Sequence, residues 1–196
     1  MKCDIILSGV GGQGILSIAA VIGEAVRREG LEIKQAEVHG MSQRGGDVQT
    51  NLRISSEKID SDLIPKGGAD AIISLEPMEA LRYTPYLKED GWVVTSSKPF
   101  INIPNYPEIE KVMAELAKMP HLLMLDVEEI ANSAKVGRSA NIVLLGAASN
   151  ILGIKEEDLI EGITNIFSRK GEAVVEANIK ALRVGAEAVK DQMESK

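Results

Sequence analysis

The apolar residues along this chain alternate between a strand-like and a helix-like period. Ile5-Ile6-Leu7 is a short continuous apolar run that ends in glycines, which is typical of a buried central strand. From Ile15 to Glu29, apolar residues recur every three or four positions and form one stripe, so the pattern predicts an amphipathic helix. Leu31 to Val38 is a second predicted strand. Val48 to Ile54 alternate apolar and polar positions, as a half-buried strand does.

The rest of the chain continues this alternation and then becomes helical. Further strands are expected at 71–75, 92–95 and 121–125, and helices at 77–83, 108–118 and 127–134. The proline-containing stretch 98–107 is expected to be a loop or a strand-edge crossing. From about residue 138 the pattern is helical, with segments at 140–152, 156–167 and 172–193. Alternating strands and helices are typical of α/β folds. We therefore expect one three-layer α/β/α Rossmann-like domain over residues 1–196, with a mainly parallel or mixed sheet and a helical C-terminal extension.

Composition and charge exclude several classes of protein. The 196 residues are 44% hydrophobic, which suits a folded core, and the formal net charge of −7 gives no electrostatic basis for binding nucleic acid. The single cysteine, Cys3, excludes a disulfide framework and any four-cysteine zinc or iron–sulfur site within this chain. With two histidines, a self-contained metal site is not expected. No apolar segment has the length of a membrane span or the form of a signal peptide, so we expect a cytoplasmic protein.

The first predicted turn carries a glycine motif. Gly9, Gly11, Gly12, Gln13 and Gly14 form the sequence GVGGQG between a buried strand and an amphipathic helix. Glycines permit a tight turn and leave backbone N–H groups unshielded at a helix start, which favours an anion. A dinucleotide would also need an acid at the end of the second strand, where Glu37 is the candidate. Three interpretations stay open: a dinucleotide site, a site for another anion, and tight strand–helix packing alone.

The polar loop HGMSQRGG, residues 39–46, is the most unusual segment. Its candidate functional residues are His39, Ser42, Gln43, Arg44, Gly45 and Gly46. The guanidinium of Arg44 beside two glycines is suited to holding a phosphate or carboxylate through two hydrogen bonds. A solvated loop in which Arg44 forms a local ion pair is the competing interpretation.

These two motifs together resemble one protein family. GVGGQG at Gly9–Gly14, HGMSQRGG and the strand at 48–54 resemble the gamma-type domain of the 2-oxoacid:ferredoxin oxidoreductases. The resemblance continues in order through EPMEALR at 76–82, Asn141 to Gly146, and Phe167 to Ala181. The loop version found here most resembles the beta subunits of the indolepyruvate branch of this family.

The resemblance implies an accessory subunit rather than a complete enzyme. Enzymes of this family decarboxylate a 2-oxoacid on thiamine diphosphate, transfer electrons through iron–sulfur clusters to ferredoxin, and form an acyl-CoA. Thiamine diphosphate, Mg²⁺ and the clusters are then expected on a larger alpha subunit, and coenzyme A at the interface with it. We assign no catalytic or metal-ligating residue to this chain. The glycine turn is the expected site for an anion or cofactor, and the polar loop the expected contact with the partner or coenzyme A.

Two alternatives from other classes remain at this stage. One is a stand-alone α/β protein that binds a dinucleotide or another anion at the glycine turn. The other is a purely structural assembly subunit that binds only protein.

Overall fold

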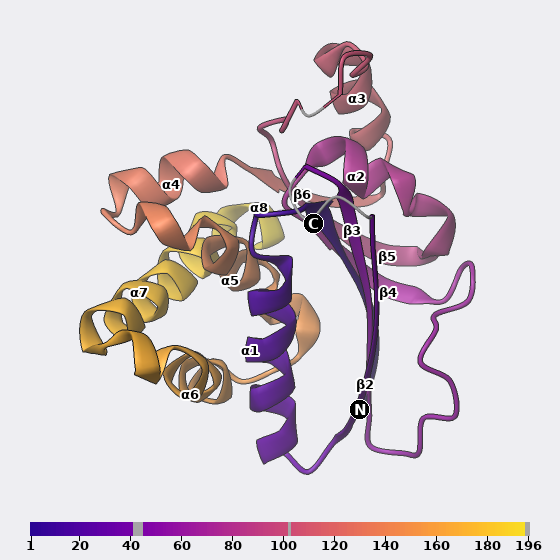
Figure 1. The fold of residues 1–196 in the computed structure, drawn as a ribbon. Helices are drawn as coiled ribbons and strands as arrows, with labels where there is room; N and C mark the ends of the chain where they lie inside the picture. The colour runs from indigo at the N-terminus through magenta and orange to yellow at the C-terminus, as the bar shows by residue number, and fades with distance from the viewer. Residues whose placement is uncertain (41–44, 102, 195–196) are drawn as a thin grey trace.

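A six-stranded mixed sheet forms the centre of the structure, a computed structural model that describes residues 1–40, 45–101 and 103–194 (Figure 1). Along the sheet the strands lie in the order β2-β3-β1-β4-β5-β6. The β1–β4, β4–β5 and β5–β6 pairs are parallel, whereas β3 pairs antiparallel with both β1 and β2. The strands are β1 (Lys2–Val10), β2 (Glu32–His39), β3 (Asp47–Ser55), β4 (Ala69–Ser74), β5 (Leu87–Ser96) and β6 (His121–Leu125).

Helices cover both faces of this sheet, which confirms the expected α/β/α layering (Figure 1). One face carries α1, α5, α6 and α7, and the other carries α2 and α3. The α-helices are α1 (Ile15–Arg28), α2 (Pro77–Arg82), α3 (Ile109–Leu116), α4 (Val127–Ser133), α5 (Ala140–Leu152), α6 (Glu156–Phe167), α7 (Glu172–Ala188) and α8 (Lys190–Glu194). Short 3₁₀ helices are η1 (Thr84–Tyr86), η2 (Gly137–Ser139) and η3 (Ser168–Lys170).

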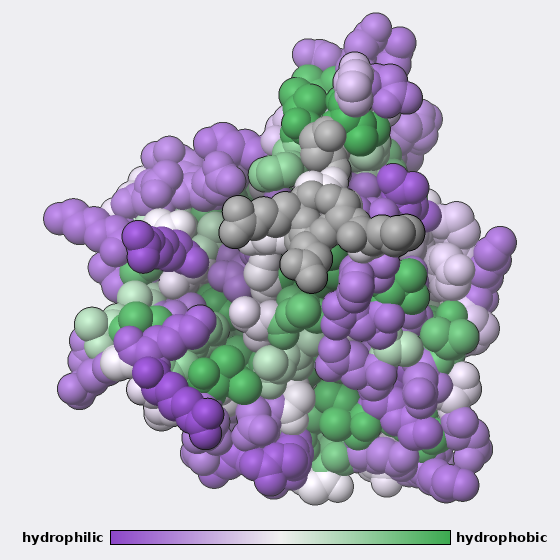
Figure 2. Space-filling view, in the orientation of Figure 1, coloured by the Kyte–Doolittle hydropathy of each residue, from purple (hydrophilic) through white to green (hydrophobic). Residues whose placement is uncertain are grey.

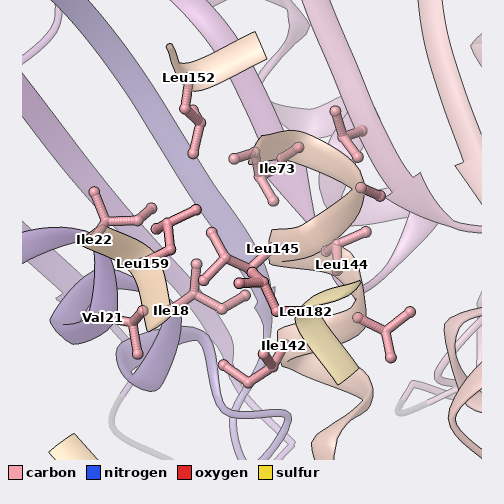
Figure 3. Packing of buried hydrophobic residues seen from close by; sticks show 14 of the residues in the cluster. Ile18, Val21, Ile22, Ile73, Ile142, Leu144, Leu145, Leu152, Leu159 and Leu182 are labelled. Atoms are coloured by element: carbon pink, nitrogen blue, oxygen red, sulfur yellow. The ribbon is translucent and has the colours of Figure 1, made fainter. Parts of the chain in front are cut away.

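The larger core lies between the sheet and the C-terminal helices. Figure 3 shows Ile22 of α1, Leu145 of α5, Leu159 of α6 and Leu182 of α7 gathered near Ile73 of β4. Helix α5 is apolar on all sides because the sheet, α1, α4 and α7 surround it. The smaller core lies on the other face, between β1, β4 and β5 and helices α2 and α3.

Helices α5 and α7 approach each other closely through two glycines. A Cβ atom on Gly185 would lie 1.9 Å from the carbonyl oxygen of Val143, and one on Gly146 would lie 1.9 Å from that of Leu182. Both distances are far below van der Waals contact, so the two helices approach this closely only because side chains are absent at these positions.

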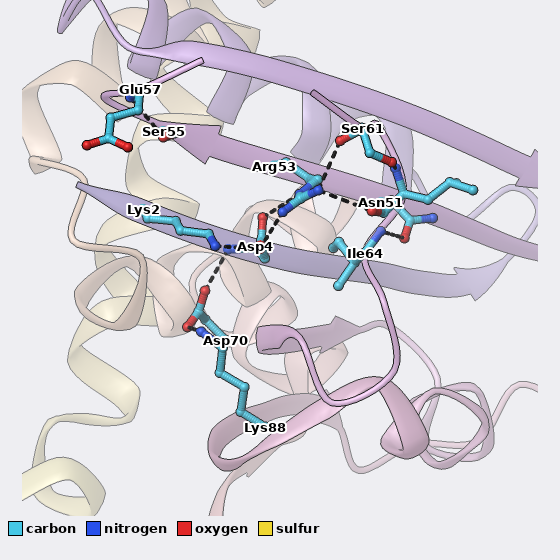
Figure 4. Close-up of polar contacts among 11 residues, drawn as sticks. Lys2, Asp4, Asn51, Arg53, Ser55, Glu57, Ser61, Ile64, Asp70 and Lys88 are labelled. Carbon is cyan, nitrogen blue, oxygen red and sulfur yellow. Dashed lines mark hydrogen bonds and ion pairs between the residues drawn. The ribbon is translucent and has the colours of Figure 1, made fainter. Parts of the chain in front are cut away.

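Polar contacts at the amino end of β1 fix the segment between β3 and β4 (Figure 4). The guanidinium of Arg53 donates two hydrogen bonds to the Asp4 carboxylate, at 2.8 and 3.0 Å. Its remaining nitrogen donates to the backbone carbonyls of Ser61 and Leu63. Cys3 lies beside this cluster, where burial raises the pKa of its thiol to about 12. A buried thiol with such a pKa remains protonated, so its chemistry is that of a core side chain.

The structure differs from the expected elements at two places. Strand β5 begins at Leu87 rather than at Trp92, because its first residues pair with β4 across a register shift between Ala69 and Ala71. The polar residues before Trp92 concealed this irregular pairing in the sequence pattern. The last predicted helix, 172–193, is interrupted at Val189 and forms α7 and α8.

We predict that Gly185→Ala lowers the free energy of unfolding by about 1–3 kcal/mol, because α5 and α7 must separate to accommodate the methyl group. Urea denaturation followed by circular dichroism measures the change. Gly23→Ala on α1 is the control, since its Cβ would lie 3.7 Å from Ile33, an ordinary contact. An equal effect of both substitutions would contradict this account of the α5–α7 contact.

Candidate functional site

The two sequence motifs meet at the carboxyl edge of the sheet, where β1, β2, β4, β5 and β6 end. Antiparallel pairing places Val10 opposite Asp47 and His39 opposite Val48, so the β2–β3 connection lies beside the glycine turn. Two backbone hydrogen bonds join them. The N–H of Gly11 donates to the carbonyl of Gly46 at 2.8 Å, and the N–H of Gly45 donates to the carbonyl of Gly11 at 3.3 Å.

Gly14 starts α1 in a conformation that favours glycine, with φ +89°. A Cβ atom there would lie 2.7 Å from the Asn141 amide nitrogen, which donates a hydrogen bond to the Gly14 carbonyl at 3.1 Å. No side chain caps the first turn of α1, so its N–H groups remain directed toward the carboxyl edge. This arrangement favours an anion at the turn.

Gln13 connects the ends of two neighbouring strands. Its side-chain oxygen accepts a hydrogen bond from the Val10 N–H at 2.7 Å, and its side-chain nitrogen donates to the Leu75 carbonyl at 3.1 Å. Both polar ends of the Gln13 amide therefore satisfy backbone groups of the sheet edge.

Two hollows flank the glycine turn. The first, which we call the β2 hollow, has a volume of about 390 Å³ and is lined by Gly11, Gly12, Gly14, Glu37 and His39 among others. Both Glu37 and His39 are exposed, and the ring Nδ1 of His39 lies 3.1 Å from the carbonyl of Gly40.

The second hollow, which we call the α7 hollow, lies between the glycine turn, the 135–141 segment and α7. Its volume is about 570 Å³, and three cations line it: Lys135, Arg138 and Lys170. None of the ion pairs formed by the described residues involves these three side chains, and the Lys170 ammonium lies 5.2 Å from the centre of the Phe167 ring. Uncapped N-termini of both α1 and α5 border this hollow, so its electrostatic potential favours negative charge.

Two buried carboxylates follow β4 at the same edge. Glu79 is held by Arg82, whose guanidinium donates two hydrogen bonds at 2.8 and 3.1 Å, and this contact raises the pKa of Arg82. Glu76 is fully buried and accepts hydrogen bonds from neutral donors: the backbone N–H groups of Glu79 and Phe100 and the hydroxyl of Tyr106. Burial raises the pKa of the Glu76 carboxyl. These contacts are structural, since they fix α2 and the segment after β5.

The sequence-predicted site residues are thus partly brought together. Gly9 and Gly11 to Gly14 lie at the end of β1, and His39, Gly45 and Gly46 lie beside them. Ser42, Gln43 and Arg44 lie outside the described residues, so their roles stay predictions. Sequence reasoning did not single out Lys135, Arg138 and Lys170, although Asn141 belonged to a segment that carried the family resemblance.

The described residues include no group of three or more His, Cys, Asp or Glu side chains placed to hold a metal ion. In the same part of the chain, no helix is both long and apolar enough to cross a membrane.

Many protein families have a mixed α/β sheet with a glycine turn at its carboxyl edge that can accept an anion. Comparison with known proteins identifies the family to which this chain belongs. The family model of the pyruvate ferredoxin/flavodoxin oxidoreductases matches residues 4–188. The indolepyruvate oxidoreductase subunit IorB of Archaeoglobus fulgidus is 37% identical over 196 residues, which cover 94% of both chains. The chain therefore belongs to the pyruvate ferredoxin/flavodoxin oxidoreductase family, and the resemblance found in its motifs is confirmed.

Two solved structures have the same fold. The 2-oxoglutarate:ferredoxin oxidoreductase of Magnetococcus marinus matches 97% of this chain with a TM-score of 0.75 and 25% identity, but the match covers only 31% of that longer chain. The gamma subunit of the keto/oxoacid ferredoxin oxidoreductase of Geobacter sulfurreducens matches 94% of this chain and 96% of its own length, with a TM-score of 0.69 and 27% identity. The domain thus occurs both as a separate subunit and as part of a longer chain.

We predict that Gln13→Glu destabilises the protein by about 1–3 kcal/mol, because a carboxylate oxygen would face the Leu75 carbonyl in place of a donor. Thermal unfolding at neutral pH measures the loss. Gln35→Glu, at an exposed position of β2, is the control and should change stability little. If Gln13→Glu were equally neutral, Gln13 would not be connecting the two strand ends.

Proposed function

We propose that this chain is the accessory subunit of a ferredoxin-dependent oxidoreductase that acts on indolepyruvate or another aryl pyruvate. The assembled enzyme would oxidatively decarboxylate the 2-oxoacid, transfer the acyl group to coenzyme A and pass the electrons to ferredoxin. The observation that carries this proposal is the 37% identity to the IorB subunit over nearly the full length of both chains. We further propose that the complex works in the cytoplasm.

The redox chemistry is assigned to a larger alpha subunit. Each cubane or rhombic iron–sulfur cluster takes about four protein ligands, and this chain has one cysteine, which is buried. The residues present therefore do not fit a cluster, and no step of electron transfer is assigned to them. Thiamine diphosphate, Mg²⁺ and the clusters belong, in this proposal, to the alpha subunit, and ferredoxin interacts with the whole complex.

The contribution proposed for this chain is to hold coenzyme A at the carboxyl edge. Coenzyme A carries several phosphate charges, and the α7 hollow offers three cations together with two helix N-termini. Ser139, which is 5% exposed, borders the same hollow and caps no N–H group of α5 with its side chain. The solved structure of the Magnetococcus enzyme has coenzyme A bound. The polar loop, Arg44 included, is proposed to contact either coenzyme A or the alpha subunit.

A dinucleotide is the second candidate ligand. Glu37 lines the β2 hollow together with Gly11, Gly12 and Gly14, a combination that a ribose and a diphosphate would use. However, β3 separates β2 from β1, whereas the dinucleotide motif requires these strands to be neighbours. Because of this strand order, the β2 hollow supports a dinucleotide less strongly than the cations of the α7 hollow support coenzyme A.

We predict that the chain assembles with an alpha subunit encoded beside it, and that only the complex oxidises 2-oxoacids. Co-expression and co-purification test assembly. Initial rates of ferredoxin reduction with indolepyruvate, phenylpyruvate, pyruvate and 2-oxoglutarate then test specificity. The expected result is a kcat/KM at least tenfold higher for the aryl pyruvates, about 1.4 kcal/mol of transition-state discrimination. A preference for pyruvate or 2-oxoglutarate would contradict the substrate assignment.

We predict that Arg138→Ala weakens coenzyme A binding to the complex by about tenfold, through loss of a charge-assisted hydrogen bond. Isothermal titration with coenzyme A and with NAD measures the affinity for each ligand. Arg169→Ala is the matched control, because this exposed arginine precedes Lys170 in sequence and does not line the hollow. Unchanged affinity in the Arg138 variant would remove the α7 hollow from the coenzyme A site, and tighter binding of NAD would favour the dinucleotide alternative.

A further inference from the structure

Large apolar side chains are exposed unevenly over the molecule. Among the described residues, seven large hydrophobic side chains are exposed, and five of these lie at or beside the carboxyl edge: Leu16, Val38, Phe100, Ile101 and Ile103. The other two, Met1 and Leu63, lie near the opposite edge. Figure 2 shows one hydrophobic patch at the top of the view, beside α3, together with other patches lower on the same face.

Three of the five side chains belong to one segment, residues 97–107. Phe100 is 44% exposed, Ile101 70% and Ile103 36%. Exposed apolar side chains this close together are unusual on a soluble surface and mark a place where another surface is bound. The three prolines of the segment, Pro99, Pro104 and Pro107, restrict its backbone further.

The protein holds this segment in place at both ends. At its start, the Ser97 N–H donates to the Leu125 carbonyl at 3.0 Å, and the Lys98 ammonium lies 3.1 Å from the Asp126 carboxylate. Farther along, Glu76 accepts a hydrogen bond from the Phe100 N–H, and at the end of the segment it accepts one from the Tyr106 hydroxyl. A fully buried carboxylate is thus used to fix a segment whose own apolar side chains stay exposed. These contacts hold Ser97, Lys98, Phe100 and Tyr106 in place before any partner binds, which lowers the entropy that these residues lose on association.

The segment is also continuous with the candidate site. A small hollow of about 100 Å³ is lined by Phe100 and Pro99 on one side and by Gln13 and Asn141 on the other. A surface that covers the segment therefore also reaches the glycine turn.

We propose that the exposed side chains of Phe100, Ile101 and Ile103 in the 97–107 segment form the main apolar docking surface of this chain for the larger subunit of its oxidoreductase. Glu76 and Tyr106 position this surface. The proposal rests on the proposed function. The choice of occupant is supported by the Magnetococcus enzyme, in which this domain matches only 31% of the chain. In such an enzyme the remaining two-thirds is covalently attached, whereas a separate chain must bind the equivalent protein through its own surface.

The test compares two substitutions at exposed apolar positions. Ile101→Glu places a charge within the proposed interface, and Leu63→Glu places one at the opposite edge, where the side chain is 59% exposed. Because both side chains are exposed, both variants should fold, and circular dichroism and melting temperature verify this. Each variant is then titrated onto the purified larger subunit. We expect Ile101→Glu to raise the dissociation constant at least tenfold and Leu63→Glu to change it less than twofold.

A second pair tests positioning. Tyr106→Phe removes the hydroxyl that donates to Glu76, and Tyr86→Phe removes a hydroxyl that is not bonded to Glu76. We expect Tyr106→Phe to raise the dissociation constant about three- to tenfold, with a smaller effect when Ile101 is already Glu, because both act through one surface. Affinity equal to that of the unmodified chain would exclude the positioning role.

The outcomes separate this inference from the proposed function. Binding of the unmodified chain together with unchanged affinity of Ile101→Glu would overturn the docking surface and leave the proposed function intact. No binding of the unmodified chain to the larger subunit would overturn both. If the chain alone forms a dimer in gel filtration that Ile101→Glu converts to a monomer, the occupant is a second copy and the assignment to the larger subunit is wrong.

Discussion

The antiparallel insertion of β3 between β1 and β2 is the constraint on which the candidate site depends. Because β3 runs back beside β1, its first residue lies opposite Val10, and the β2–β3 connection must end beside the glycine turn. The two hydrogen bonds between Gly11 and the Gly45–Gly46 backbone follow from this register. In a regular doubly wound sheet, β2 would lie next to β1, and no segment would be available to contact the turn from that side. The same insertion moves Glu37 one strand away from β1, which weakens the dinucleotide interpretation.

Helices and strands were predictable from the sequence where the apolar residues have a strong period. They were less predictable where pairing between strands determines their bounds. Strand β6 and helices α5 and α6 have the predicted bounds, because each is a clear apolar run or stripe between turn residues. The alternation at Val48–Ile54 also indicated a half-buried strand suited to an antiparallel position. The early start of β5 was not predictable, since residues 88–91 lie within the register shift between the Ala69–Leu87 and Ala71–Trp92 pairs, and such a shift has no period in the sequence. Strand order likewise depends on contacts between distant residues, which no local pattern contains.

The residues of the candidate site were likewise predictable in part. The glycine turn and the polar loop could be singled out because each departs from ordinary composition within a few residues. The cations of the α7 hollow could not, because Lys135, Arg138 and Lys170 are ordinary surface residues until the fold places them around the start of α1. The stretch 98–107 was predicted only as a loop or a strand-edge crossing. The role that we propose for it depends on Glu76, whose contacts with Phe100 and Tyr106 cross 24 and 30 positions of the chain.

The charged side chains of the described residues include two distinct groups: buried carboxylates that have partners within the fold, and cations that surround the α7 hollow. The four buried carboxylates of the described residues all have partners within the fold. Asp4 is paired with Arg53, Glu79 with Arg82 and Asp158 with Arg28, whereas Glu76 accepts from neutral donors. Against a net charge of −7, the cations of the α7 hollow form a local exception. Such an exception attracts an anion at short range, within about a Debye length of 8–10 Å, while the molecule as a whole repels it at low salt. The backbone N–H groups, glycines and cations that line the α7 hollow all belong to this one chain. The geometry of the hollow therefore does not depend on a covalent link to another part of the enzyme. The same domain can therefore occur as a separate subunit or as about a third of a longer polypeptide, and in the docking arrangement that we propose its exposed apolar side chains are covered in both.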